Sequence, residues 1–146
     1  MNHDKLVHRA DRWLRGQGYT VVLTEASDMQ QEIVDAIGWK MKAIGVESCV
    51  IECKATRADF IRDRRKPSRG LMSGMGNLRY YLIPPTTWSG DDLPIPDGWG
   101  LLVANKTGIA VKRQPVARHN FNMCDAERTL LYVALKRRTQ WIATST

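Results

Sequence analysis

The stretch that decides the fold is residues 33–55, IVDAIGWKMKAIGVESCVIECKA. It holds two runs rich in β-branched and aliphatic residues, 33–41 and 48–55, separated by a turn that contains Gly45. Runs of this composition are typical of β-strands, and glycine suits the tight turn between them. The stretch therefore predicts a β-hairpin.

Charged side chains interrupt this hairpin near its open end, with Asp35 on the first strand and Glu52 and Lys54 on the second. Because side chains alternate between the faces of a strand, Glu52 and Lys54 share one face and Cys53 lies on the other. A turn centred near residues 43–44 places Asp35 opposite Glu52 or Cys53. Directly opposed residues lie roughly 4.5–5.5 Å apart, where two carboxylates repel each other unless a cation lies between them.

Carboxylate oxygens at this spacing are ligands that suit Mg²⁺ or Mn²⁺. A bound metal would lower the pKa of a water molecule and stabilise charge on a phosphate, and Lys54 would orient that water or neutralise the developing charge. The alternative is a solvated strand face, because a Glu-x-Lys pattern is common on strands. The aspartate on the preceding strand, the apolar setting and the capped, basic helix that follows favour the catalytic interpretation.

Hydrophobic periodicity and turn residues predict further elements on both sides of the hairpin. Thr56 is expected to cap a helix, with Asp59 completing a capping box, and Pro67 is expected to end it. The expected elements are helices over residues 4–16, 57–66 and from Asn122 onward, and strands over 19–23, 78–83, 101–104 and 109–112. This order predicts an α/β fold with a central mixed β-sheet flanked by helices, in one domain over residues 1–146.

The composition indicates a globular protein. Hydrophobic residues make up 43% and charged residues 25% of 146 residues, which is enough for a real core. The sequence has no apolar run of the length that spans a membrane and no signal-peptide layout, so a cytoplasmic location without a membrane partner is expected. The cysteine count is odd, which argues against a disulfide framework, and Cys49 and Cys53 are expected in the core rather than in a zinc site.

A net charge of +7 suits a polyanionic partner, and DNA is the expected one. The planar fork of arginine matches phosphate oxygens, and Arg79 on a predicted strand is one candidate contact. The other candidates lie in and after the predicted helix: Arg57, Arg62, Arg64, Arg65, Lys66 and Arg69. The alternative for this helix is a solvated face on which Asp59 and Asp63 balance the charge.

Two neighbouring features leave alternatives open. The glycine-rich stretch 70–76, GLMSGMG, is either a mobile flap over a substrate or a flexible connection. Tyr80 and Tyr81 must point to opposite faces of their strand, so one of them shares the face of the predicted site. That tyrosine either contacts the substrate or packs in the core.

The pattern Val34-Asp35 followed by Glu52-Cys53-Lys54 resembles the motif of the PD-(D/E)XK nuclease superfamily. The order helix, three-strand meander, helix, strand resembles its restriction-endonuclease-like core. Three segments, VDAIGW, VIECKATRADFIRDRRKP and LRYYLIPP, are similar to small bacterial and phage proteins of this superfamily, and the resemblance covers residues 4–104. It implies that Asp35, Glu52 and the backbone carbonyl of Cys53 bind Mg²⁺ or Mn²⁺, with Lys54 as the catalytic lysine.

The function implied by the resemblance is a metal-dependent DNA endonuclease acting in DNA repair, recombination, restriction or phage DNA processing. A homodimer would allow one short domain to cut both strands. The sequence departs from the family pattern where Val34 replaces a frequent proline, and where the first predicted helix offers Asp4, His8 and Asp11 in place of a frequent glutamate. The alternative functions are an inactive nucleic-acid-binding domain that keeps the nuclease fold, and a protein-interaction factor.

Overall fold

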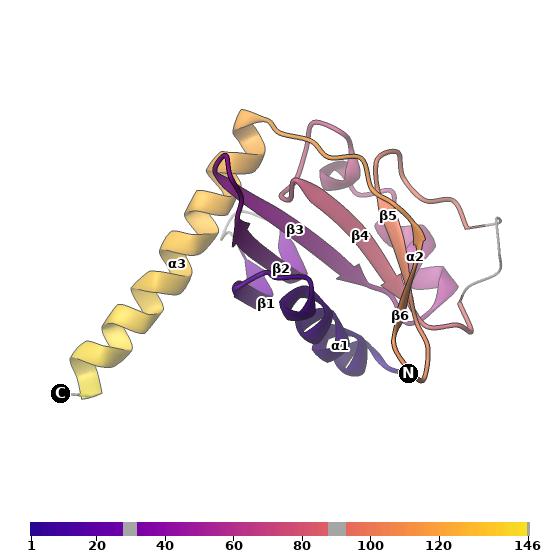
Figure 1. Ribbon diagram of the computed structural model, residues 1–146, viewed down its shortest axis with the longest axis horizontal. Helices are drawn as coiled ribbons and strands as arrows, with labels where there is room; N and C mark the ends of the chain where they lie inside the picture. The colour runs from indigo at the N-terminus through magenta and orange to yellow at the C-terminus, as the bar shows by residue number, and fades with distance from the viewer. Residues whose placement is uncertain (28–31, 88–92, 146) are drawn as a thin grey trace.

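The computed structural model describes residues 1–27, 32–87 and 93–145, with side chains to residue 140. Figure 1 shows the elements in space. In chain order they are α1 (His3–Gly16), β1 (Val21–Ser27), β2 (Ile33–Met41), β3 (Val46–Cys53), α2 (Arg57–Asp63), the 3₁₀ turn η1 (Pro67–Arg69), β4 (Leu78–Ile83), β5 (Gly100–Ala104), β6 (Ile109–Arg113) and α3 (Phe121–Ser145). The predicted order of helices and strands is confirmed, and β2 and β4 have the predicted bounds.

The strands form one six-stranded sheet in the order β1-β2-β3-β4-β5-β6. The first three strands are an antiparallel meander, β3 to β4 and β4 to β5 are parallel, and β5 pairs antiparallel with β6. Parallel neighbours require a crossover connection, and α2 with η1 supplies the one between β3 and β4. The predicted α/β class with a central mixed sheet is therefore confirmed.

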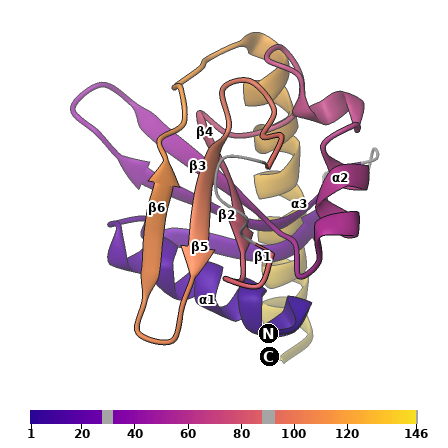
Figure 2. The same ribbon diagram turned by 90° about the vertical axis from the view of Figure 1, so that its right-hand side faces the viewer.

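Helix α1 covers one face of the sheet (Figure 2). Its apolar stripe includes Leu6, Ala10 and Leu14, which recur at helical spacing and are fully buried. Cys49 and Cys53 lie in the same core cluster, as predicted, and burial raises the pKa of the Cys49 thiol to about 12. These thiols are therefore small apolar core groups at neutral pH.

The opposite face is covered by α2 over β4 and β5 and by α3 over β2 and β3. Phe60 of α2 packs edge-on against Tyr81, with the ring centroids 4.8 Å apart. Leu130 of α3 packs in a cluster with Ile37. The Glu127 carboxylate fixes α3 to the sheet, because it accepts hydrogen bonds from Trp39 Nε1 at 2.9 Å and from the Ser48 hydroxyl at 3.0 Å. The later part of α3 projects past the sheet in Figure 1.

Two helix boundaries differ from the prediction. Helix α3 is capped by Asn120, whose side chain accepts a hydrogen bond from the backbone N–H of Met123, and not by Asn122. Helix α2 ends at Asp63 instead of continuing to residue 66, because Lys66 is extended ahead of Pro67. A proline disfavours the helical conformation in the residue before it, so the helix ends earlier than the proline itself.

The capping box at the start of α2 is only half formed. The Thr56 hydroxyl accepts a hydrogen bond from the backbone N–H of Asp59, as predicted. The Asp59 carboxylate pairs with Arg62 one turn later.

In the described part of the chain, no helix combines the length and the apolar composition that crossing a membrane requires.

Candidate active site

The β2–β3 register brings Asp35 and Glu52 together. Ala36 pairs with Ile51, so the next position along the ladder sets Asp35 opposite Glu52. The Asp35 carboxylate also accepts a hydrogen bond of 2.7 Å from the backbone N–H of Cys53. The predicted pairing of the hairpin is therefore confirmed, and it results from the turn position and the strand alternation.

Glu52 is a buried carboxylate with an incomplete set of partners. The residue is 2% exposed, and its Oε2 lies 3.5 Å from a guanidinium nitrogen of Arg69. Its Oε1 is buried and has no hydrogen-bond partner among the described residues. Burial raises the pKa of Glu52 well above the usual value, and the charges of Asp35 and Asp63 raise it further, while Arg69 opposes this.

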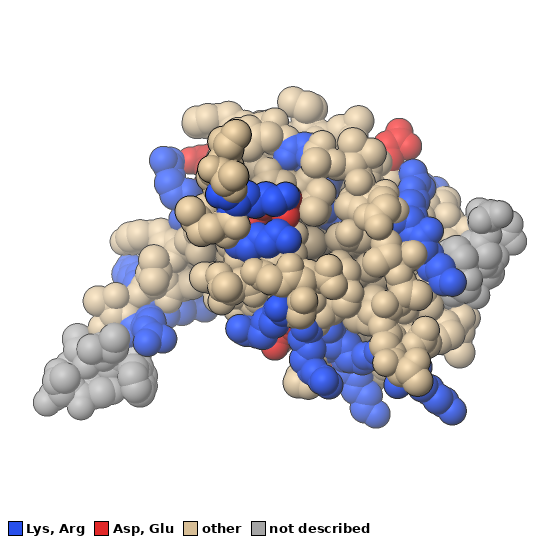
Figure 3. Space-filling model, viewed as in Figure 1, with Lys and Arg blue, Asp and Glu red and all other residues tan. Residues whose placement is uncertain are grey.

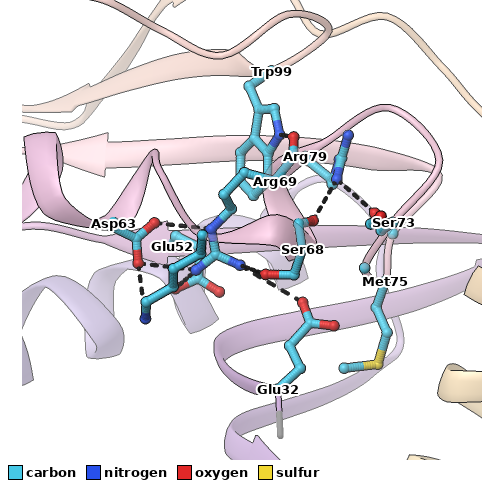
Figure 4. Close-up of polar contacts among 12 residues, drawn as sticks. Glu32, Glu52, Asp63, Ser68, Arg69, Ser73, Met75, Arg79 and Trp99 are labelled. Atoms are coloured by element: carbon cyan, nitrogen blue, oxygen red, sulfur yellow. Dashed lines mark hydrogen bonds and ion pairs between the residues drawn. The ribbon is translucent and has the colours of Figure 1, made fainter.

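Asp63, at the end of α2, is the most heavily hydrogen-bonded carboxylate of this region (Figure 4). It accepts two hydrogen bonds of 2.9 Å from Arg69 and one of 2.6 Å from the Tyr81 hydroxyl. It also pairs with Lys54 Nζ at 3.0 Å and with Lys66 Nζ at 3.3 Å. Burial raises the pKa of Asp63, but the hydrogen bonds and charges of Arg69, Tyr81 and Lys54 overcome it and hold the pKa below the usual range.

Arg69 lies between the carboxylates of Asp63 and Glu32 in Figure 4. Its guanidinium binds Asp63 through two nitrogens and lies 3.8 Å from Glu32. Trp99 also holds Arg69 in place, because its indole N–H donates to the Arg69 carbonyl at 3.0 Å. The Arg69 residue is only 4% exposed, so it is an internal partner of the carboxylates. The prediction that it contacts nucleic acid from the surface is wrong.

Arg79 is also internal, and the same correction applies to it. It is 2% exposed and donates to the carbonyls of Ser68 and Ser73 at 3.1 and 3.0 Å. Its guanidinium lies 4.6 Å from the centre of the Trp99 ring. Burial, together with the positive charge of nearby arginines, lowers the pKa of Arg79 to about 9. Strand alternation places Arg79 on the same face as Val50 and Glu52, which α2 and the following loop cover.

The glycine-rich stretch 70–76 is held in place by a residue far along the chain. The guanidinium of Arg118 donates to the carbonyls of Leu71, Ser73, Gly74 and Met75 at 2.6 to 3.0 Å, and also to that of Gly76 at 2.9 Å. Such a set of bonds to one cation favours the interpretation of this stretch as a fixed connection rather than as a flap.

The remaining predicted phosphate contacts lie on and just after α2. A hollow of about 340 Å³ opens there, and Lys54, Arg62, Lys66 and His3 are among its lining residues. Lys54 is 17% exposed, so its ammonium reaches this hollow while it stays paired with Asp63. Arg57, Arg62, Arg65 and Lys66 are exposed, and Arg64 is partly buried.

A second group of potential ligands lies beside Asp35. His3 Nε2 is 3.1 Å from a carboxylate oxygen of Asp35. Ligand atoms of His3, Asp4 and Glu25 all lie within 4.8 Å of one another, a spacing that suits a cation. Glu25 interrupts β1 with a φ of 51°, between two regular pairs of the β1–β2 register and at the level of Asp35. Sequence reasoning missed His3 and Glu25, because neither belongs to a recognisable spacing.

Asp63 was predicted only as a possible balancing charge on a solvated helix face. One feature of the sequence does predict that the Asp63 side chain is buried. Phe60 is the aromatic anchor of α2, and residues three apart share a helix face, so Asp63 must face the sheet together with Phe60. Tyr81 pairs with Glu52 in the β3–β4 register, which sets its hydroxyl on this same face.

No protein-family model matches the chain, and the comparison with curated proteins finds no match. Among solved structures, the fold is similar to that of the SPO1766 protein of unknown function from Silicibacter pomeroyi. The two chains superpose with a TM-score of 0.70 and share 20% sequence identity, and the match covers 99% of this chain and 94% of that chain. The likeness therefore extends over the whole architecture, and at this identity it shows the fold alone.

Proposed function

We propose that this chain is a metal-dependent nuclease with a restriction-endonuclease-like core, and that it hydrolyses phosphodiester bonds of DNA at Asp35, Glu52 and Lys54. The observation that carries the proposal is the buried Oε1 of Glu52, which has no hydrogen-bond partner among the described residues. An unsatisfied buried polar group costs about 1–3 kcal/mol, and more when it is charged. A cation beside Glu52 and Asp35 would offset that penalty.

The donor set suits Mg²⁺ or Mn²⁺, since both prefer oxygen ligands. Asp35, Glu52 and the backbone carbonyl of Cys53 would hold the metal. The oxygens of Asp35 already accept hydrogen bonds from His3 and Cys53, but each retains a lone pair for a metal. When bound, the metal supplies a water of lowered pKa and a positive charge for the phosphate.

Lys54 is the residue of this chain that acts on the reacting groups. Its ammonium is held 3.0 Å from Asp63, at the edge of the hollow. Because the pKa of Asp63 is lowered, this carboxylate stays ionised at neutral pH and keeps Lys54 charged and oriented. The ammonium donates to the attacking water or to a phosphate oxygen. A bond would form between phosphorus and the water oxygen while the water loses a proton to solvent, and the bond to the leaving sugar oxygen would break as that oxygen takes up a proton from solvent.

The exposed cations of α2 extend the site. Arg62 lines the hollow that Lys54 reaches. Arg57 and Arg65 are exposed at the start of this helix and just beyond its end. Guanidinium groups in this place would bind phosphates that flank the cleaved one, and would release counterions as they do so.

The arrangement of elements supports the superfamily assignment. The aspartate lies on the middle strand of an antiparallel meander, Glu52 lies near the end of the third strand, and Lys54 follows directly after that strand. The next strand, after the crossover through α2, is parallel to the third. This is the element order and the motif placement that the resemblance implies.

The test is cleavage of plasmid, linear, single-stranded and branched DNA with Mg²⁺, with Mn²⁺ and with EDTA. Glu52→Gln and Lys54→Ala are expected to reduce metal-dependent cutting by at least about a hundredfold. Glu47→Gln is the matched control, because it removes one charge from the other end of β3 and should cut normally.

Cutting that persists in Glu52→Gln would show that another nuclease or another site is responsible. Salt-dependent DNA binding without cutting under any condition would identify an inactive nucleic-acid-binding domain instead.

A further inference from the structure

A basic groove lies between α1 and the turn that joins β5 to β6. Its volume is about 530 Å³. Helix α1 contributes Arg9, Arg12 and Trp13, and the turn contributes residues 106–109, including Lys106. None of these described lining residues carries a negative charge. The groove therefore combines positive charge on both walls with an aromatic side chain.

The walls of this groove are fixed by the protein itself. Arg9 donates to the carbonyl of Asn105 at 2.6 Å and to that of Gly108 at 2.8 Å, and so ties the turn to α1. Within the turn, the side-chain oxygen of Asn105 accepts hydrogen bonds from the backbone N–H groups of Thr107 and Gly108. A groove that is organised before a ligand arrives loses less free energy on binding.

The other two cations of the groove have no polar partner among the described residues. Arg12 and Lys106 are exposed, and neither has an ion-pair partner or a side-chain hydrogen bond within the described ranges. Arg15, one turn further along the same helix, is paired with Asp11 at 2.9 Å. Figure 3 shows Lys and Arg side chains gathered along the lower edge of this view, where Figure 1 places α1 and the β5–β6 turn.

We propose that this groove is a second nucleic-acid-binding surface, in which Arg12 and Lys106 bind the phosphate backbone of the DNA that enters the candidate active site. The proposal rests on the proposed function for the identity of the polyanion. Two unpaired cations on opposite walls suit a strand of phosphates that passes between them.

Helix α1 links the groove to the candidate active site. His3 at its start lines the hollow beside Lys54, and Arg12 lies in the groove. A further hollow lies along the helix between them, and its charged lining residues are Asp4, Lys5, Arg9 and Arg12. From His3 to Arg12 a helix advances about 13 Å, and one strand of B-DNA rises about 3.4 Å per nucleotide. DNA that runs parallel to α1 would therefore contact the groove about four nucleotides from a phosphate beside His3.

The test measures binding of a fluorescein-labelled duplex by anisotropy, in EDTA, between 50 and 200 mM salt. The variant combines Arg12→Ala with Lys106→Ala. The matched control combines Arg15→Ala with Arg128→Ala, which removes the same charge from exposed arginines that are already paired with aspartates. We expect the groove variant to bind at least about tenfold more weakly and to lose roughly 2 from the slope of log K against log salt. The control should change little in either measure.

Equal losses in the two double variants would overturn the proposal, because net charge alone would then explain the binding. Polyglutamate that competes as well as DNA at the same concentration of charge would also overturn it, by assigning the groove to acidic polypeptides. The proposal would also be overturned if the wild-type protein did not bind DNA.

The groove and the nuclease activity can fail separately. Binding in EDTA does not require cutting, so a groove variant with weakened binding supports the groove even if the wild type never cuts DNA. Metal-dependent cutting by a wild type whose groove variant binds DNA normally would support the nuclease and overturn the groove.

Discussion

Replacing Glu52 with glutamine is expected to stabilise the protein in the absence of metal. Burial raises the pKa of Glu52, so the folded state holds its proton more tightly than the unfolded state does. The contribution of this group to stability is therefore greatest below its unfolded pKa, near 4.5, and falls as the pH rises toward the folded pKa. Each unit of upward shift corresponds to about 1.4 kcal/mol at neutral pH.

The magnitude follows from the surroundings of the side chain. Glu52 is 2% exposed, so water screens its charge little, and its Oε1 has no partner among the described residues. Glutamine removes the charge, keeps the shape and leaves Arg69 with both of its bonds to Asp63. We expect a gain of about 1–3 kcal/mol in EDTA at pH 7, which raises Tm by about 2–4 °C for each kcal/mol.

Urea unfolding, followed by circular dichroism in EDTA and in Mg²⁺, measures this gain. Wild-type protein should be stabilised by metal, by about 2.7 kcal/mol when Mg²⁺ is at a hundred times its Kd, and Glu52→Gln should respond little. Glu47→Gln is a control for which we expect the opposite change in stability. Burial raises the pKa of Glu47, but hydrogen bonds from Tyr19 and Lys42 overcome it and lower the pKa, so the loss of this charge should destabilise the protein at pH 7. Its response to Mg²⁺ should remain.

The reasoning would be refuted if Glu52→Gln were less stable than the wild type in EDTA at neutral pH. It would also be refuted if the variant and the wild type gained equally from Mg²⁺. Either result would mean that the buried carboxylate is already compensated by the protein and does not need a cation.

Three further predictions concern Asp63, which binds Arg69, and the two turn glycines Gly74 and Gly45. Asp63→Asn should lower the free energy of unfolding by about 3–5 kcal/mol, because it breaks the buried ion pair in which Arg69 binds this carboxylate through two nitrogens. The control Asp59→Asn, at a half-exposed position, should change it by less than about 0.5 kcal/mol in urea unfolding. The lowered pKa of Asp63 gives stability that is present above its unfolded pKa, near 3.8, and is lost as the pH falls further, so acid titration of Asp63→Asn should lack this phase. Gly74→Ala should be far more harmful than Gly45→Ala in thermal unfolding: both have positive φ, but only at Gly74 would the added Cβ lie 2.4 Å from a backbone oxygen.

The sequence was sufficient to predict the β2–β3 hairpin and the placement of its charged residues. This worked because the interactions are local. The turn at Gly45 fixes the register, and alternation along each strand then decides which side chains share a face. Glu52 and Asp35 are set opposite each other by these two facts alone.

The partners of these carboxylates could not be predicted in the same way. In the sequence, Arg69 follows the arginines of the preceding helix and resembles them. Neighbouring positions do not show which of these cations are buried and which are exposed. The extended Lys66 and the 3₁₀ turn that starts at Pro67 redirect the chain, so that Arg69 points back toward Asp63. Arg79 was placed correctly on its strand, but its burial depends on a loop that Arg118, much later in the chain, holds over it.

The electrostatic pattern of the site favours a functional explanation over a structural one. Asp63 binds Lys54 at 3.0 Å and binds Arg69 through two nitrogens, so the two cations nearest Glu52 are already occupied. The pKa of Asp63 is lowered and that of Glu52 is raised, although both carboxylates are buried in the same cluster. Surroundings that raise the pKa of one carboxylate and lower that of its neighbour are typical of functional sites.

A fold that needed only stability would do better with apolar side chains here, because buried ion pairs seldom stabilise more than well-packed hydrophobic residues. The arrangement instead gives Asp63 the role of holding Lys54 and Arg69, and leaves the carboxylate of Glu52 without full compensation. Removing Asp63 would free Arg69 to pair with Glu52, lower the pKa of Glu52 and reduce the gain from a bound cation. Because the cations of this cluster bind Asp63 more closely than Glu52, the Asp35–Glu52 pair is the place where a divalent metal would bind.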